Sequence, residues 1–335
     1  GYCMTTVPMT LKDIYQLAKS VMMNNGCDKP NAEALADIIM RAERDGSHSH
    51  GLFRVAGYVK ALRSGKVDGK AKPEIEKITP AIIKVHGNGC FAPIAQSLGL
   101  PTLVESTKKV GIGALSLTGI HHFAALWPET EYLADNGLVG IACTAYMPSV
   151  APAGSKTALF GTNPISFAWP RREGTPIVYD MATASMAMGD VQIALRDGQI
   201  LPEGTGLNAE GKPSIDPAEI INGVLLPFGG YKGSAISLMV ELLAAGLTGE
   251  QFSYEAKEND NGDGGPPRGG EIIIGISPDI IAGPKWNEHV KNFTDKMLAM
   301  EGVRLPGARR HQNRLNTGIR EIDKNLLKTI HELNS

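Results

Sequence analysis

The stretch GIGALSLTGIHHFAALWPETEYLADNGLVGIACTA, residues 111–145, holds the pattern that decides the fold class. Residues 113–118 and 138–145 are apolar runs with β-branched members and flanking glycines, which is typical of buried strands. The residues between them, 123–135, have the length and pattern of a helix. The order strand, helix, strand predicts an α/β protein. Gly111-Ile-Gly113 has no glycine three residues later, and neither has Gly204-Thr-Gly206, so the GxGxxG fingerprint of the usual dinucleotide-binding fold is missing.

The alternation of strands and helices extends outward from this stretch, and helical patterns flank it at both chain ends. Near the first end, Thr10 is expected to cap the first helix. We expect the helices of the two ends to pack together around a core that contains a mixed sheet. The polar segment KENDNGDGGPPRGG, residues 257–270, is expected to be a mobile surface loop. The further predicted strands are 81–85, 177–180 and 271–276, and the further predicted helices are 10–25, 30–44, 51–64, 93–109, 232–246 and 316–334.

Composition narrows the class of protein. The chain has 335 residues, with 33 Lys and Arg against 35 Asp and Glu, which gives a formal charge of −2. This balance excludes a generally basic nucleic-acid binder and an acidic tail. Apolar residues make up 42% and charged residues 20%, which indicates a globular protein with a large core. The 39 glycines indicate many turns and many close approaches of backbone.

Cysteine spacing and hydropathy predict the compartment. The four cysteines are far apart and form no CxxC pair, which indicates reduced thiols rather than a disulfide scaffold. The three residues before Met4 are expected to be foreign to the native protein, and no signal pattern follows them. The longest apolar run, 235–247, contains Glu241 and is too short to span a bilayer. We therefore expect a cytoplasmic protein without a membrane or nucleic-acid partner.

The strongest local signal for chemistry is GSHSHGLFR, residues 46–54. If a helix begins near His50, Arg54 lies one turn further on the same face, and Tyr58 continues that face. Histidine can supply a proton near neutral pH, and arginine can bind a carboxylate with two hydrogen bonds. The plainer interpretation is that Ser49 caps a helix and His50 is a surface histidine. Because no carboxylate or cysteine cluster accompanies His48 and His50, no metal site is expected.

Several other segments place small, hydroxyl or cationic residues at strand or helix ends, where backbone N–H groups can meet a ligand. Each is weak alone and is also compatible with an ordinary turn. In one of them, Asp190 could orient a histidine. The segments are HHF at 121–123, FGTNP at 160–164, YDMATAS at 179–185, GDVQIA at 189–194, PFGGYKG at 227–233 and RLPGARR at 304–310.

Together these motifs resemble those of the malate/L-lactate dehydrogenase family, also called L-sulfolactate dehydrogenase-like. The resemblance covers residues 11–333 and rests on SHG at 49–51, FGTNP, YDMATAS, PFGGYKG and RLPG. It implies a non-Rossmann NAD(P)-binding fold. Within the family, RDGSHSHG at 44–51, HHFAALWP at 121–128, GDVQIA and LPFGGYKGSA at 226–235 are most similar to Δ1-piperideine-2-carboxylate/Δ1-pyrroline-2-carboxylate reductases.

The resemblance implies roles for particular residues. His50 matches the catalytic proton donor, Asp190 its partner acid and Arg54 the ligand of the substrate carboxylate. The implied catalytic set is His50, Ser49, Asp190, Ser47 and His48, and the implied substrate-binding set is Arg54, Tyr58, Thr162 and His122. The implied cofactor-binding set is His121, His122, Phe123, Ala124, Ala125, Asp180, Met181, Ala182, Thr183, Ala184, Ser185, Tyr231, Lys232, Gly233, Arg304, Leu305, Pro306, Gly307, Arg309 and Arg310.

The expected activity follows from these roles. It is the NADPH-dependent reduction of cyclic 2-imino acids to L-pipecolate or L-proline, with NADPH preferred to NADH because the arginines of 304–310 suit a 2′-phosphate. The alternatives are a dehydrogenase of 2-hydroxy acids (malate, lactate or ureidoglycolate) and a ligand-binding homologue without turnover.

The resemblance also implies a homodimer. We expect a discontinuous helical domain of residues 4–75 and 285–335. A core of residues 76–115 and 145–284 and a cofactor-binding part within 116–225 complete the predicted organisation.

Overall fold

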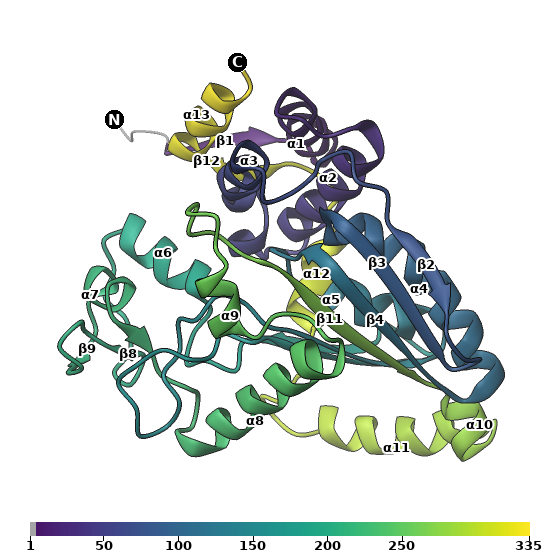
Figure 1. The fold of residues 1–335 in the computed structure, drawn as a ribbon. Helices are drawn as coiled ribbons and strands as arrows, with labels where there is room; N and C mark the ends of the chain where they lie inside the picture. Colours follow the sequence, from purple (N-terminus) through teal and green to yellow (C-terminus); the bar gives the residue numbers. More distant parts are fainter. Residues whose placement is uncertain (1–4) are drawn as a thin grey trace.

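The structure is a computed structural model that describes residues 5–335, so the predictions that concern residues 1–4, Cys3 among them, lie outside it. Figure 1 shows a helical unit above a long central sheet and a smaller unit beside the sheet. None of the helices in the described part of the chain has the length and apolar character needed to cross a membrane.

The central sheet has seven strands in the order β2-β3-β4-β11-β5-β6-β7. Only β3 and β4 run parallel, and every other neighbouring pair is antiparallel, so the predicted mixed sheet is confirmed. The strands are β2 (Glu74–Lys77), β3 (Ile82–Phe91), β4 (Ile112–His121), β5 (Val139–Thr144), β6 (Ile165–Trp169), β7 (Ile177–Met181) and β11 (Arg268–Ile276).

Alternation along the strands buries both faces of this sheet. On β11, Ile273 faces a core that includes Leu103 of α4 (Ala92–Val110), whereas Ile272 faces Val240 of α8 (Tyr231–Glu241). The face of Ile273 is also covered by α5 (Trp127–Asp135), and α8 continues into a π-helical turn, Leu242–Leu247. The remaining helices on this unit are α9 (Ser253–Glu258), α10 (Pro278–Ala282), α11 (Trp286–Leu298) and α12 (Ala308–Arg314).

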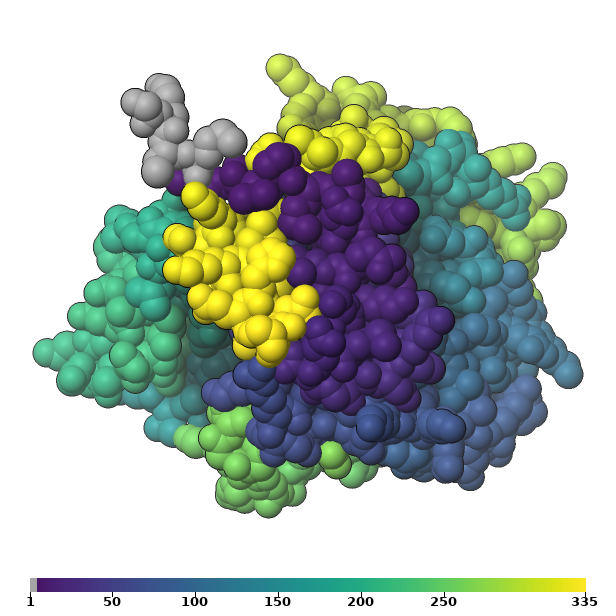
Figure 2. Space-filling model, turned by 90° about the horizontal axis from the view of Figure 1, so that it is seen from above, coloured from purple at the N-terminus to yellow at the C-terminus, as the bar shows by residue number. Residues whose placement is uncertain are grey.

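The helical unit is built from both ends of the chain. Its core joins Ile14 and Leu35 to Leu327 and Ile330, which come from almost 300 residues later. In Figure 2 the C-terminal segment lies directly against the N-terminal helices. The expected packing of the end helices is therefore observed, although the predicted domain boundaries stay a prediction. The elements are β1 (Thr6–Met9), α1 (Leu11–Asn24), α2 (Lys29–Arg44), α3 (Val55–Ser64), β12 (Arg320–Asp323) and α13 (Lys324–Leu333).

The prediction of one closing helix over 316–334 is wrong in its first half. Residues 320–323 form β12, which pairs antiparallel with β1. Asp323 then caps α13 by accepting a hydrogen bond from the N–H of Leu326 (2.8 Å). The pairing partner lies more than 300 residues away, so local periodicity does not reveal this strand.

The smaller unit packs a short sheet and two helices around Phe160, Val191 and Leu225. Its three strands have the order β10-β8-β9. The elements are α6 (Met188–Arg196), β8 (Gly206–Leu207), β9 (Pro213–Ser214), α7 (Pro217–Ile221) and β10 (Val224–Leu225). Cys27, Cys90 and Cys143, the cysteines within the described residues, are buried and unpaired.

Candidate active site

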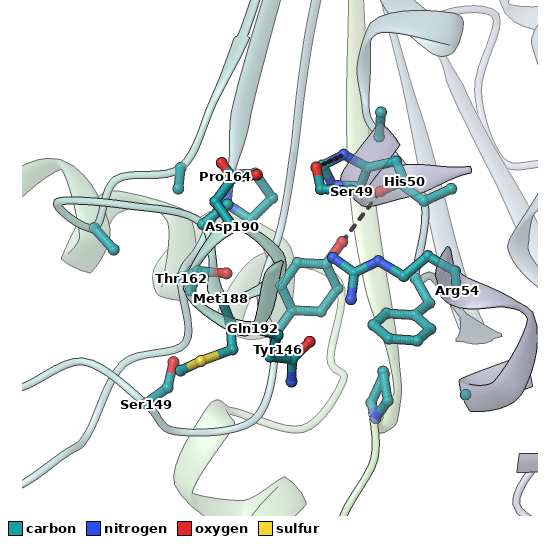
Figure 3. A pocket seen from close by; sticks show the side chains of 18 of the residues that line it. Ser49, His50, Arg54, Tyr146, Ser149, Thr162, Pro164, Met188, Asp190 and Gln192 are labelled. Atoms are coloured by element: carbon teal, nitrogen blue, oxygen red, sulfur yellow. Dashed lines mark hydrogen bonds between the residues drawn. The ribbon is translucent and has the colours of Figure 1, made fainter. Parts of the chain in front are cut away.

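A cavity of about 750 Å³ lies where the helical unit, the central sheet and the smaller unit meet. This volume is in the range of cofactor and ligand sites. Figure 3 shows that side chains from all three parts converge on it. The helical unit contributes Ser49, His50 and Arg54, and the smaller unit contributes Met188, Asp190 and Gln192.

The segment that carries Ser49, His50 and Arg54 is not the start of a long helix, so the prediction of a helix over 51–64 is wrong at its beginning. His48–His50 and Leu52–Arg54 form two separate 3₁₀ turns, and α3 begins at Val55. The break has a local cause at Gly51. The Glu43 carboxylate accepts a hydrogen bond from the N–H of Leu52 (2.9 Å), and a Cβ on Gly51 would lie 2.2 Å from that same carboxylate oxygen. The one-turn spacing expected for His50 and Arg54 therefore does not apply.

His50 is half-buried and shares a hydrogen bond with its neighbour, between the Ser49 hydroxyl and His50 Nδ1 (3.1 Å). Ser49 and Asp190 both line the cavity. Burial, together with the charges of Arg54 and His122, lowers the pKa of His50 to about 3. Burial raises the pKa of Asp190, while Ser49 and Arg54 oppose the rise. In this state His50 is a neutral imidazole at neutral pH.

Arg54 is the positively charged residue that lines the cavity beside His50. It is 8% exposed, and its guanidinium lies over the ring of Phe123, 4.0 Å from the ring centre. Its Nε has no hydrogen-bond partner among the described residues. A Cβ on Gly189 would lie 2.9 Å from Arg54 Nη2, so this glycine lets α6 approach the guanidinium. The side chain is held in place and retains unused hydrogen-bond donors.

Many of the residues predicted for cofactor and substrate binding line the same cavity. Asp180 also accepts hydrogen bonds from the N–H groups of Leu126 (2.7 Å) and Trp127 (2.8 Å) and so holds the start of α5. Thr183 is fully buried, and its hydroxyl donates hydrogen bonds to the carbonyls of Thr162 and Asn163. The lining residues from the predicted sets are Ser47, Ser49, His50, Arg54, Phe123, Ala124, Ala125, Thr162, Asp180, Met181, Ala182, Ala184, Ser185, Asp190 and Arg310.

Other predicted residues lie outside the cavity lining. His48 points to Glu43 (3.1 Å) and its side chain is 63% exposed. Tyr231 and Lys232 are exposed at the start of α8, where Gly233 packs against Phe228. The RLPG segment bonds the edge of β7, since the N–H of Val178 donates to the carbonyl of Pro306 (3.1 Å). The predicted residues outside the lining are His48, Tyr58, His121, His122, Thr183, Tyr231, Lys232, Gly233, Arg304, Leu305, Pro306, Gly307 and Arg309.

His122 belongs to a buried charged cluster behind the cavity. Its Nε2 lies 2.9 Å from a Glu129 oxygen and 3.6 Å from a Glu271 oxygen, and Gln96 donates to Glu271 (2.8 Å). Burial lowers the pKa of His122, but the two carboxylates prevail and raise it to about 10. We describe this group, His122, Glu129 and Glu271, as the carboxylate cluster. The sequence pattern did not point to Glu129 or Glu271, which lie on α5 and β11.

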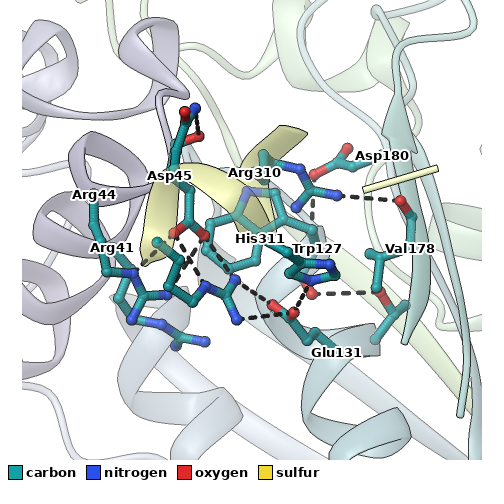
Figure 4. Close-up of polar contacts among 12 residues, drawn as sticks. Arg41, Arg44, Asp45, Trp127, Glu131, Val178, Asp180, Arg310 and His311 are labelled. Atoms are coloured by element: carbon teal, nitrogen blue, oxygen red, sulfur yellow. Dashed lines mark hydrogen bonds and ion pairs between the residues drawn. The ribbon is translucent and has the colours of Figure 1, made fainter. Parts of the chain in front are cut away.

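Arg310 stands out among the arginines around Trp127. Arg41, Arg310 and Arg314 all place their guanidinium groups over this ring. Figure 4 labels Arg41 and Arg310 together with Trp127. Arg314 is paired with Asp45 and Glu131 (2.8 Å each). Arg310 bonds only the carbonyl of Val178 (3.3 Å), and its buried Nη1 has no partner within residues 5–335. It is therefore a cation at the cavity with capacity to bind an anion.

The loop after α9 is part of the site, which differs from the expectation of a mobile surface loop over 257–270. Lys66 binds Asp260 (2.8 Å), Asp263 and the carbonyl of Gly265 (3.1 Å), and Ser64 donates to Asp263 (2.7 Å). These contacts tie the loop to the end of α3, and its residues 263–266 line the cavity. The asparagines, aspartates and glycines suggested only a loop, because the lysine that binds them lies almost 200 residues earlier.

Comparison with known proteins places this site in a family. The sequence model of the malate/L-lactate dehydrogenase family matches residues 9–331. A Δ1-pyrroline-2-carboxylate/Δ1-piperideine-2-carboxylate reductase of Pseudomonas putida is 44% identical over 311 residues, which cover 92% of this chain and 91% of the relative. A Δ1-pyrroline-2-carboxylate reductase of Ancylobacter novellus is 41% identical, with 92% and 91% covered.

Solved structures agree with the sequence relatives. The Δ1-piperideine-2-carboxylate reductase of Pseudomonas syringae pv. tomato superposes with a TM-score of 0.89 at 41% identity, covering 98% of this chain and all of the other. The sulfolactate dehydrogenase of Methanocaldococcus jannaschii superposes with a TM-score of 0.87 at 28% identity, covering 98% and 96%. The predicted fold, of the L-sulfolactate dehydrogenase-like type, is thereby confirmed. This chain belongs to the malate/L-lactate dehydrogenase family.

Proposed function

We propose that this protein is an NADPH-dependent reductase of cyclic 2-imino acids, which converts Δ1-piperideine-2-carboxylate to L-pipecolate and Δ1-pyrroline-2-carboxylate to L-proline. The observation that carries the proposal is Arg54, a buried cation with an unpartnered Nε beside His50 in the cavity. A small carboxylate next to a proton-carrying group is the ligand that this pair can recognise. The reductases named above share 41% to 44% of their residues with this chain.

The cavity has features that fit a nicotinamide cofactor. Ala124, Ala125, Ala182 and Ala184 leave room on its lining, and Arg310 offers its unpartnered Nη1 there. When bound, the reduced nicotinamide supplies a hydride to carbon. We assign Arg310 to the 2′-phosphate that distinguishes NADPH from NADH.

The chain's own residues orient the substrate and move its proton. Arg54 holds the carboxylate so that the C=N carbon is fixed in the cavity. The bound carboxylate offsets the charge of Arg54, which is one of the causes that lower the pKa of His50. Its arrival therefore raises the pKa of His50 and allows the imidazole to carry the proton for the ring nitrogen. The Ser49 hydroxyl shares a hydrogen bond with His50, and Asp190 lines the same cavity, so we assign to Ser49 and Asp190 the replacement of the proton.

The test is a parallel assay of NADPH consumption with Δ1-piperideine-2-carboxylate, Δ1-pyrroline-2-carboxylate, pyruvate and oxaloacetate. We expect the two cyclic imines to be reduced with the highest kcat/KM. Preference for a 2-keto acid would assign the protein to 2-hydroxy acid chemistry instead. Binding of NADPH without turnover of any substrate would indicate a non-catalytic homologue.

The cofactor assignment has its own test. Arg310→Met should weaken NADPH binding about tenfold or more and leave NADH binding nearly unchanged, because a charged hydrogen bond to the phosphate is lost. Titration of nucleotide fluorescence measures both affinities without turnover. Equal losses for the two nucleotides would contradict the assignment to the 2′-phosphate.

A homodimer is also proposed. Its support is the exposed apolar surface of α8 and the π-helical turn that follows, where Tyr231 is 74% and Leu247 66% exposed. Sedimentation equilibrium should give twice the chain mass of 35.7 kDa. Leu242→Glu, in the same surface, should shift the protein toward the single-chain mass.

A further inference from the structure

Tyr146 is a cavity residue that no sequence motif singled out. It follows β5, and its side chain lines the cavity together with the next residues of the same turn. The FGTNP loop packs closely against its backbone, since a Cβ on Gly161 would lie 2.7 Å from the backbone nitrogen of Tyr146. One glycine of a predicted ligand motif thus allows the close approach of this loop to Tyr146.

The hydroxyl of Tyr146 points toward the cation of the site. In Figure 3 the ring stands in the middle of the cavity, with its hydroxyl end toward Arg54 and His50. The hydroxyl's one partner among the described residues is the carbonyl of Ala124, at 3.4 Å, which is a long and weak hydrogen bond. Burial raises the pKa of Tyr146, and Arg54 opposes that rise, so the hydroxyl keeps its proton as a donor.

Tyr58, which the resemblance suggests for substrate binding, is placed differently. It is 1% exposed and packs edge to face against Phe91 and Phe123. Phe123 is also the ring on which Arg54 lies, and Tyr58 is not part of the cavity lining. Of the two tyrosines near Arg54, only Tyr146 is exposed to a ligand in the cavity.

We propose that Tyr146 is a second ligand of the substrate carboxylate, whose hydroxyl donates a hydrogen bond to the group that Arg54 binds. A carboxylate has two oxygens and accepts several hydrogen bonds, so a guanidinium and a phenol can share it. The ring of Tyr146 then forms the wall against which the substrate ring packs. This inference rests on the proposed function for the identity of the substrate, but any small 2-oxo or 2-imino carboxylate would be held in the same way.

Removing the hydroxyl alone tests the first part of the proposal, the hydrogen bond from Tyr146 to the substrate carboxylate. Tyr146→Phe should raise KM for both cyclic imines about tenfold or more, with a much smaller change in kcat, because a charged hydrogen bond is lost in substrate binding. Calorimetry should show the same loss for pyrrole-2-carboxylate, an unreactive planar analogue, in the presence of NADPH. The matched control is Tyr15→Phe, which makes the same change in α1, where Tyr15 bonds Glu33 and lies outside the cavity lining.

Replacing the ring with a smaller side chain enlarges the cavity. It tests the second part of the proposal, that the ring of Tyr146 is the wall against which the substrate ring packs. Tyr146→Leu should lose the hydroxyl's contribution and also move the ratio of kcat/KM toward the six-membered imine, whereas Tyr146→Phe should leave that ratio unchanged. Thermal unfolding of each variant shows whether its fold is intact. If Tyr146→Leu does not fold, Tyr146→Met serves the same purpose.

The outcomes separate this inference from the proposed function. Unchanged KM and analogue affinity in Tyr146→Phe would overturn the inference even if the wild type reduces both imines. A larger rise in KM for Tyr58→Phe than for Tyr146→Phe would also overturn it. If the wild type turns over only 2-keto acids, the proposed function fails, and the KM of pyruvate or oxaloacetate in Tyr146→Phe then decides the inference.

Discussion

Two histidines near the cavity occupy surroundings of opposite electrical character. Burial disfavours the charged form of both. For His50 the charges of Arg54 and His122 act in the same direction as burial, whereas His122 lies beside Glu129 and Glu271, which oppose burial. The pKa of His50 is accordingly lowered to about 3, and that of His122 is raised to about 10. Because burial lowers both pKa values, the neighbouring acids are the reason that His122 is the positive one.

The largest effect, on the free energy of unfolding, should come from replacing His122, the cation of the carboxylate cluster. Burial and the neighbouring Glu271 raise the pKa of Glu129, so Glu271 is the carboxylate that His122 balances. His122→Leu leaves that buried carboxylate without its cation and should cost about 3–5 kcal/mol of unfolding free energy. Urea unfolding near neutral pH measures the loss. The control is His86→Leu, which breaks an exposed His–Glu pair with Glu76 and should cost less than about 1 kcal/mol. If His122→Leu and His86→Leu lose the same small free energy of unfolding, the carboxylate cluster does not contain a buried ion pair.

The next effect concerns the neutral histidine. His50→Asn should lower kcat for imine reduction about a hundredfold or more, since the proton carrier is lost while Arg54 still binds the carboxylate. Steady-state kinetics with both imines measures it. His48→Asn decides between the two histidines of the motif, because His48 is turned toward Glu43. A greater loss of kcat in His48→Asn than in His50→Asn would move the proton-carrying role to His48.

A smaller effect, on KM, is expected when Arg54, the cation beside His50, is replaced with a cation of a different shape. Arg54→Lys should raise KM about tenfold, because an ammonium cannot reproduce the two parallel hydrogen bonds of a guanidinium. The pKa of His50 should stay below its ordinary value, since a positive charge remains. NMR titration of the His50 ring protons checks the second point, and an unaltered KM would argue against carboxylate binding at this position.

The smallest effect is a change in the pH dependence of stability. Burial lowers the pKa of His121 to about 3, and neither ring nitrogen has a partner among the described residues. Between about pH 6.5 and pH 3 the unfolded chain therefore binds one more proton here, and stability falls as the pH is lowered. His121→Phe should reduce that slope by up to about 1.4 kcal/mol per pH unit.

Urea unfolding at about pH 7 and about pH 5.5 measures this slope. His289→Phe, at an exposed position on α11, should leave it as in the wild type. An identical slope in His121→Phe and the wild type would show that His121 is protonated alike in both states.

Local sequence rules predicted the elements whose causes are local. The first helix begins at its expected cap, with the Thr10 side chain accepting from the N–H of Asp13 (3.0 Å). The second helix, predicted from residue 30, begins at Lys29, where the Asp28 side chain accepts from the N–H of Asn31 (3.0 Å). The strand β12 and the tethered loop after α9 were not predicted. Their partners, β1 and Lys66, lie some 200 to 300 residues away, and no local pattern encodes such a distance.

The same limit applies to the site. The motif residues Ser49, Arg54 and Asp190 were found from their own local sequence, and the resemblance to a known family then assigned their roles. Tyr146 was not found, because its position beside Arg54 arises only when the turn after β5 meets the helical unit. The carboxylate cluster likewise joins residues of three separate segments, and of these only His122 was singled out by its own stretch of sequence.

The pairing of β1 with β12 has a consequence for the order in which the protein matures on the ribosome. The residues of α1 to α3 are synthesised well before Leu327 and Ile330, which belong to the same core. This core cannot close until residue 330 has emerged from the exit tunnel, although domains made early usually fold early. The segment that carries His50 and Arg54 is thus translated long before the core beside it can be completed.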